Sequence, residues 1–119
     1  MHLTAFCILS VLLMTSAYDD IDDNFDHNSQ LNDIKQLRQL LDCFLDKGYC
    51  TEVESHIKAH LPDQIITNCQ NCDTVQKHFA RIFFNNVKKN FPEEYEEYKK
   101  KYDLDGKHLE SLEKAISTF

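Results

Sequence analysis

Glycine and proline are scarce in this sequence, with two of each in 119 residues. Average usage of about 7% for glycine and about 5% for proline would supply several more of each. All-β proteins need many turns, so this scarcity argues against a β-sandwich or barrel. Two glycines also barely suffice for a glycine-rich phosphate loop or a G-x-S-x-G nucleophile turn, and neither motif is present.

Basic residues are too few to make a phosphate-binding face. The chain has 13 basic and 20 acidic residues, which gives a net charge of −7. This balance argues against a nucleic-acid partner and against adsorption to anionic lipid. With 42% hydrophobic and 28% charged residues, the chain has the composition of one globular domain.

The sequence has no apolar run of the roughly 20 residues that a membrane-spanning helix needs. The longest run, from Ala5 to Met14, is followed by small residues at the spacing of a signal-peptidase site. We therefore expect residues 1–17 to be a signal peptide, and residues 18–119 to form one soluble domain that is secreted to the extracellular space. Positive charge before the run is limited to His2 and the amino terminus, so a retained anchor is the alternative.

Removal of the signal peptide would leave an even number of cysteines: Cys43, Cys50, Cys69 and Cys72. An even number in a secreted chain predicts disulfides, and four cysteines allow three connectivities. The spacing does not choose among these three. A four-thiolate zinc site is a weaker alternative in an oxidising compartment. A redox role for the Cys69–Cys72 pair is also weak, because no βαβ pattern surrounds it.

Apolar residues recur at steps of three and four from Leu31 to Leu45, which predicts an amphipathic helix. We expect this helix to end at Gly48 in a left-handed cap. Thr51 and Glu54 have the spacing of a capping box, so a second helix is predicted to start there. Its apolar face is carried by Val53, Ile57, Leu61, Ile65 and Ile66.

Pro62 lies within this second pattern and is expected to kink or restart the helix, because proline lacks the backbone N–H. Asp73 and Gln76 form another capping signature, which opens a long helix with an apolar face. That face comprises Val75, Phe79, Ile82, Phe83 and Val87.

Pro92 is well suited to the first position of a further helix. The aromatic stripe of this helix comprises Phe91, Tyr95, Tyr98 and Tyr102, and its acidic start and basic end suit the helix dipole. A last helix is expected after Asp105-Gly106, with Leu109, Leu112 and Ile116 on its apolar face. The acidic stretch 18–32 is predicted to be a loose arm with one short helix. No strand pattern occurs, so we predict an all-α fold of about six helices.

No group of residues has the pattern of a catalytic site, so we do not expect an enzyme, a metal or a cofactor. His56 and His60 stand four residues apart, but no His-Glu-x-x-His motif joins them, and a polar helix edge is the simpler interpretation. Asp103 to Gly106 resembles part of a calcium loop, but Lys101 stands where the first ligand would be.

The cysteines are separated by six, eighteen and two residues, and several short motifs accompany them along residues 18–119. These motifs are Tyr18-Asp19-Asp20-Ile21-Asp22, Leu45-Asp46-Lys47-Gly48, Leu61-Pro62-Asp63, Pro92-Glu93-Glu94, Lys101-Tyr102-Asp103 and Asp105-Gly106. In this combination the chain resembles the insect chemosensory proteins, also called the OS-D family. It departs from the family pattern at Leu40, where an aromatic is frequent, at Tyr95, where tryptophan is frequent, and in a longer polar arm at 24–30.

The resemblance implies a compact six-helix domain, disulfides between neighbouring cysteines, and an internal hydrophobic channel. Such a channel carries fatty acids, long-chain alcohols, and pheromone or odorant molecules. Carried over residue by residue, the resemblance places Tyr95 and Tyr98 near a mouth. It places along the channel Leu37, Leu40, Leu41, Phe44, Ile57, Leu61, Ile66, Phe79, Ile82, Phe83 and Val87. At each position, plain core packing is the alternative.

Our first hypothesis is therefore a secreted carrier, expected to be a monomer, whose partner is a small hydrophobic ligand. Burial of hydrocarbon, at about 0.8 kcal/mol per methylene, would drive its binding. The second hypothesis is a secreted developmental, regeneration or immune-response factor that acts through a protein partner. In that case the acidic surface and the arm would matter more than the interior.

Overall fold

The structure is a computed structural model that describes residues 27–119. The predicted signal peptide and the first part of the acidic arm lie outside the described residues. Within residues 27–119 the chain forms six helices and no strand, which confirms the predicted all-α fold. None of these helices is long and apolar enough to cross a membrane.

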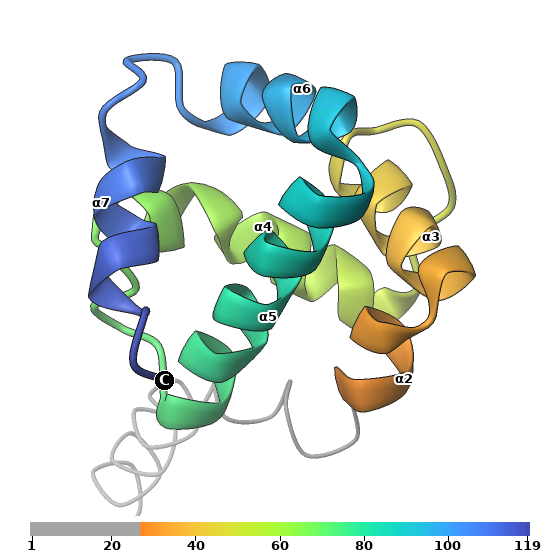
Figure 1. The fold of residues 1–119 in the computed structure, drawn as a ribbon, viewed down its shortest axis with the longest axis horizontal. Helices are drawn as coiled ribbons and strands as arrows, with labels where there is room; N and C mark the ends of the chain where they lie inside the picture. Colours follow the sequence, from red (N-terminus) through yellow and green to blue (C-terminus); the bar gives the residue numbers. More distant parts are fainter. Residues whose placement is uncertain (1–26) are drawn as a thin grey trace, which may run out of the picture.

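The helices pack in a compact arrangement around α5 (Figure 1). Their bounds are α2 (His27–Asn32), α3 (Ile34–Phe44), α4 (Glu52–Ile66), α5 (Thr74–Asn90), α6 (Pro92–Tyr102) and α7 (His108–Ala115). α5 contacts α2, α3 and α6, whereas α4 contacts α3, α6 and α7. In Figure 1, α4 and α5 cross in the middle, α6 lies across one end, and α2 and α7 lie on opposite sides.

The predicted amphipathic helix begins at Ile34 rather than at Leu31, which is a correction, and Leu31 lies in the short helix α2, within the stretch 18–32 where one short helix was predicted. α2 ends at Asn32 and α3 begins at Ile34, because the Asp33 carboxylate accepts from the backbone N–H of Lys35 at 2.9 Å. This carboxylate satisfies N–H groups that a continuous helix would have bonded internally. Leu31 thus belongs to α2, where it is buried.

The end of α3 is also corrected. The helix ends at Phe44, and the left-handed residue is Asp46, with φ of 62°, rather than Gly48. The N–H of Lys47 bonds the carbonyl of Asp42 at 2.8 Å, which turns the chain back on itself. Gly48 is needed for a different reason, because a Cβ there would lie 3.2 Å from the Cβ of Asp42.

The predicted capping boxes are confirmed at the starts of α4 and α5. At α4 the Thr51 hydroxyl accepts from the Glu54 N–H, and the Glu54 carboxylate accepts from the Thr51 N–H. Asp73 and Gln76 make the same reciprocal pair at α5. Pro62 does not restart α4, which continues through it to Ile66.

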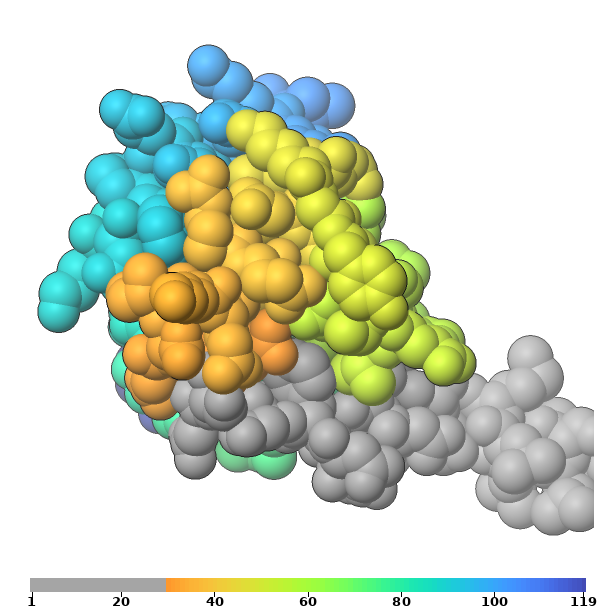
Figure 2. All heavy atoms as spheres, turned by 90° about the vertical axis from the view of Figure 1, so that its right-hand side faces the viewer, coloured from red at the N-terminus to blue at the C-terminus, as the bar shows by residue number. Residues whose placement is uncertain are grey.

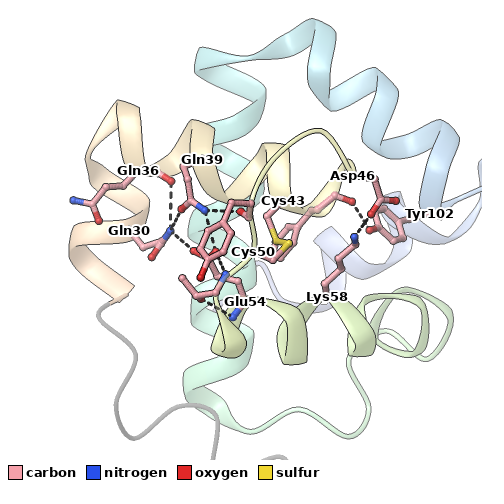
Figure 3. The surroundings of a disulfide bond; sticks show 12 residues. Gln30, Gln36, Gln39, Cys43, Asp46, Cys50, Glu54, Lys58 and Tyr102 are labelled. Carbon is pink, nitrogen blue, oxygen red and sulfur yellow. Dashed lines mark hydrogen bonds and ion pairs between the residues drawn. A yellow bond between two sulfur atoms is a disulfide. The ribbon is translucent and has the colours of Figure 1, made fainter.

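Glu54 also joins three helices, although the capping box alone did not predict this. Only 2% of this residue is exposed. Its carboxylate accepts from the side-chain amides of Gln39 on α3 at 3.0 Å and Gln30 on α2 at 2.9 Å (Figure 3). The cap of α4 is therefore also the point where α2 and α3 are fastened.

Two disulfides close local loops. Cys43 is bonded to Cys50 and Cys69 to Cys72, each pair with Cα atoms 5.0 Å apart. This confirms the neighbouring pairing implied by the family resemblance. The first bridge closes the turn after α3, and the second closes the connection between α4 and α5.

Candidate functional site

Aromatic side chains from α3, α5 and α6 meet in the interior. The ring of Phe83 on α5 lies 5.4 Å from the ring of Phe44 on α3 and 5.9 Å from that of Tyr98 on α6. Phe84, the next residue on α5, lies 5.8 Å from Tyr98. Edge-to-face and tilted contacts of this kind stabilise aromatic clusters. We call the set Phe44, Phe79, Phe83, Phe84, Tyr95, Tyr98 and Tyr102 the aromatic core.

Tyr98 is the centre of the aromatic core. It has 0% exposure, and its ring lies within 6.5 Å of the rings of Phe83, Phe84, Tyr95 and Tyr102. Its hydroxyl is buried and has no hydrogen-bond partner in the described part of the chain. Burial raises the pKa of Tyr98 well above the ordinary value, so the group stays a neutral phenol.

The two neighbouring tyrosines have partners. The Tyr95 hydroxyl donates to the Glu113 carboxylate on α7 at 2.7 Å. The Tyr102 hydroxyl donates to the carbonyl of Phe44. Burial, followed by the hydrogen bond to Glu113, raises the pKa of Tyr95. Burial raises the pKa of Tyr102 to about 12, with a smaller effect from the Asp46 carboxylate.

Most of the side chains that were expected to line a channel lie in the interior and pack on one another. Those that are buried are Leu37, Leu40, Leu41, Phe44, Leu61, Phe79, Phe83, Val87, Tyr95 and Tyr98. Ile57 and Ile82 are half-buried against the same core. Whether any of them contacts a ligand stays a prediction.

Ile66 does not join this set. It is 64% exposed, whereas Ile65 is buried in its place. The reason is geometric, because consecutive helical residues point about 100° apart and Ile65 follows Leu61 at four residues. Tyr98, which was expected near a mouth, is fully buried in the structure and lies against the rings of Phe83 and Phe84 on α5.

Sequence reasoning missed Phe84 and gave Val75 a buried position. Phe84 is buried in the aromatic core, whereas Val75 is half-exposed. The signal was present in the spacing, since Ala80, Phe84 and Val87 continue a four-and-three pattern beside that of Phe79 and Phe83. The buried face of α5 is therefore wider than the single stripe that was predicted.

Two surface pockets lie at the edges of the aromatic core. A groove of about 720 Å³ is lined by Tyr95 and by residues of α6, α7 and their connection. A smaller pocket of about 450 Å³ is lined by residues of α4, Asp46, Cys50 and the C-terminal end of α6, including Tyr102. Each pocket thus has one tyrosine of the aromatic core in its wall.

The polar residues singled out in the sequence have structural surroundings of their own. Among residues 27–119, no three His, Cys, Asp or Glu side chains gather as metal ligands would, and His56 and His60 are no exception. Asp103 instead accepts from the backbone N–H groups of Leu109 at 2.9 Å and His108 at 3.1 Å. It therefore caps α7.

Comparison with known proteins agrees with this geometry. The sequence matches the model of the insect pheromone-binding family, A10/OS-D, over residues 15–110. The Drosophila melanogaster protein named "Putative odorant-binding protein A10" is 33% identical over 94 residues, covering 79% of this chain and 61% of that protein. The chain therefore spans less than two thirds of this relative. Allergen Tha p 1 of Thaumetopoea pityocampa is 32% identical over 101 residues, covering 85% of this chain and 80% of the allergen.

A solved structure has the same fold. A chemosensory protein in complex with bromo-dodecanol matches with a TM-score of 0.71 and 28% sequence identity, covering 82% of this chain and 97% of that chain. The helical fold, the two local disulfides and the match over residues 15–110 lead to one conclusion. The chain belongs to the insect pheromone-binding family A10/OS-D, that of the chemosensory proteins.

Proposed function

We propose that this protein is a secreted carrier for small amphiphilic molecules that have an alkyl chain and one hydrogen-bonding group. The observation that carries the proposal is the Tyr98 hydroxyl, which is buried in the aromatic core without a partner among the described residues. An unsatisfied buried hydroxyl costs about 1–3 kcal/mol. A ligand whose polar group reaches Tyr98 recovers this energy, while its chain replaces contacts between apolar side chains.

The chemistry of Tyr98 indicates which polar groups fit. A phenol can donate one hydrogen bond and accept others, so it suits a neutral polar group such as an alcohol, an aldehyde or an ester. The similar structure of a chemosensory protein holds bromo-dodecanol, which is an alkyl chain with one alcohol group. This likeness supports a ligand of the same class.

A ligand can reach Tyr98 only if the helices around the aromatic core separate, because the ring is fully buried. The disulfides do not oppose this motion, since each closes a loop next to its own helix and neither joins α5 to α6. Short closed loops also add only about 2 to 2.5 kcal/mol each to the free energy of unfolding. The interior is therefore held by packing, which a ligand can replace.

The test is displacement of a fluorescent lipophilic probe by 1-dodecanol, with Tyr98→Phe compared to the wild type. An extrinsic probe is needed because the chain has no tryptophan. We expect Tyr98→Phe to weaken dodecanol binding by about threefold to tenfold, the value of one net hydrogen bond. The variant should also unfold at higher denaturant concentration, because it no longer buries an unpaired hydroxyl.

Tyr95→Phe is the matched control. It removes the same atom from the same helix, but this hydroxyl already bonds Glu113. It should therefore lower stability and leave the dodecanol affinity unchanged. Equal losses of affinity in both variants would contradict a role for Tyr98. If the probe never binds to folded, helical protein, the carrier function is wrong and a protein partner becomes the favoured hypothesis.

A further inference from the structure

A carboxylate held between two lysines marks the turn after α3. Asp46 projects from this turn, and its two carboxylate oxygens contact different ammonium groups: Oδ1 that of Lys58 on α4, and Oδ2 that of Lys101 on α6. Its side chain is 53% exposed. Hydrogen bonds from Lys101 and Lys58 lower the pKa of Asp46 to about 2, so the group is a carboxylate at neutral pH.

The pocket of about 450 Å³ lies beside this cluster and has mixed walls. Its apolar part comprises Cys50, Ala59, Pro62 and Tyr102, and its polar part comprises Asp46, Ser55, Lys58 and Lys101. Figure 3 shows Asp46 and Lys58 pointing toward one another beside Tyr102 and the Cys43–Cys50 bridge. An apolar wall next to two convergent ammonium groups is the complement of an amphiphile with an anionic head.

One side chain, Tyr102, belongs both to the wall of this pocket and to the aromatic core. The ring of Tyr102 lies 4.8 Å from that of Tyr98, the residue proposed above to meet the ligand. The turn that carries Asp46 lies at the surface after α3, next to the first part of α4 (Figure 2). A ligand that enters here would meet the lysines first and Tyr98 behind Tyr102.

The intramolecular ion pairs are of the kind that a ligand can replace. Exposed ion pairs contribute little to stability, because water and salt screen them. A ligand carboxylate offers Lys58 and Lys101 the same two oxygens, and burial of its chain adds binding energy of its own.

We propose that this pocket is a head-group site for long-chain carboxylates, in which Lys58 and Lys101 bind the ligand carboxylate and Asp46 competes for the same lysines. This inference rests on the proposed carrier function and deepens it by naming the residues that would hold an anionic head group and the residue that competes with it. Asp46 is then a specificity residue, because it penalises carboxylates and leaves neutral alcohols unaffected.

The test is Asp46→Asn, measured by probe displacement with dodecanoate and with 1-dodecanol at neutral pH. Asparagine tolerates the left-handed backbone at this position, where φ is 62°, so the turn is preserved. We expect the affinity for dodecanoate to rise about threefold to tenfold, because Lys58 and Lys101 lose their partner in the protein and can pair with the ligand carboxylate. The affinity for dodecanol should stay unchanged. The gain should shrink at high salt.

A second, independent test removes the two lysines and should lower the affinity for dodecanoate. Lys58→Gln combined with Lys101→Gln should weaken dodecanoate binding and leave dodecanol binding unchanged. Glu52→Gln is the charge control, because it removes the same negative charge from an exposed position at the start of α4. It should not change either affinity.

The outcomes separate the two proposals. If dodecanol displaces the probe but Asp46→Asn leaves dodecanoate binding unchanged, the head-group site is wrong and the carrier function stands. An equal gain in Glu52→Gln also overturns it, because the effect would then follow net charge. If neither ligand displaces the probe from any variant, the carrier function itself fails, and this inference fails with it.

Discussion

Three tyrosines on α6 show how surroundings decide what one side chain contributes. Tyr95 and Tyr102 have the same chemistry as Tyr98, but each donates its hydroxyl to an acceptor, Glu113 or the carbonyl of Phe44. These two therefore fasten α6 to α7 and to the end of α3. Within residues 27–119 the hydroxyl of Tyr98 has no hydrogen-bond partner, so it fastens no helix there.

Glu54 is a second residue whose role exceeds its local pattern, and its removal gives a prediction for stability. Glu54→Ala should lower the free energy of unfolding by about 1–3 kcal/mol, because the backbone N–H of Thr51 and the side-chain amide of Gln39 lose the buried carboxylate that accepts from them. The free energy of unfolding of Glu54→Gln should lie between those of the alanine variant and the wild type, since glutamine keeps one acceptor oxygen. The measurement is urea denaturation followed by circular dichroism.

Glu52→Ala serves as the control for Glu54→Ala. Glu52 lies two residues earlier in the same first turn, but it is exposed. Its loss should cost less than about 1 kcal/mol, the usual effect of an acidic residue on the helix dipole. Equal losses in both alanine variants would show that burial of Glu54 contributes nothing.

At the scale of elements, the helices are defined mainly by their starts. α3, α4 and α5 each begin at a side chain that accepts a backbone N–H. α7 is different, because its cap does not come from the residue directly before the helix. Asp103 lies earlier, in the connection after α6, and its carboxylate reaches forward to the N–H groups at the start of α7. The loop between α6 and α7 is thereby tied to the helix that follows it, and Gly106, with φ of 70°, allows the turn.

This forward cap predicts a stability loss that depends on pH. Asp103 is 6% exposed, and burial alone would raise its pKa, but the N–H groups of Leu109 and His108 lower it below the usual value. A lowered pKa means that the carboxylate stabilises the fold above the unfolded-state pKa of about 3.9. This contribution is lost as the pH falls from there through the lower folded-state pKa.

Asp103→Ala should therefore lower the free energy of unfolding by about 1 to 2 kcal/mol at pH 7, as the loss of a helix cap does. The difference from wild type should narrow as the pH falls from about 4 through the lower folded-state pKa of Asp103, because protonation of the wild-type carboxyl then removes its charge. Chemical denaturation at several pH values measures it. Asp105→Ala, an exposed neighbour, is the control, and a pH-independent difference would argue against the cap.

At the scale of the whole molecule, one hydrophobic core joins the described helices. The buried residues form one cluster that draws on all six described helices. The two disulfides close short loops, and neither joins two of the helices α4, α5 and α6 directly. The contacts of α6 with α4 and α5 therefore rest on side-chain packing and on polar contacts such as those of Asp46 with Lys58 and Lys101.

The carrier function predicts a thermal shift. At a free dodecanol concentration of ten times the Kd, linkage adds about 1.4 kcal/mol to the native state. For a domain of this size this corresponds to a rise in Tm of about 6 to 11 °C. Hexanol at the same concentration should give a much smaller shift, because each missing methylene removes about 0.8 kcal/mol of binding energy. An unchanged Tm at saturating dodecanol would contradict the carrier function.

The sequence by itself determined the features that depend on near neighbours. The capping boxes at Thr51 and Asp73, the start of α6 at Pro92 and the all-α class follow from residues within a few positions of one another. The cysteine spacing, together with the motifs around it, identified the family and implied the disulfide pairing. These signals are local, so no knowledge of packing was needed to interpret them.

Only the tertiary structure decided which residues of each apolar face enter the core. Ile66 lies outside and Phe84 inside because the helices packed on α4 (α3, α6 and α7) and on α5 (α2, α3 and α6) determine which side of each is covered, and periodicity does not specify that packing. The meeting of Asp46, Lys58 and Lys101 is of the same kind, since it joins residues from three parts of the chain. The sequence gives the charge of each of these residues, but long-range packing brings them together.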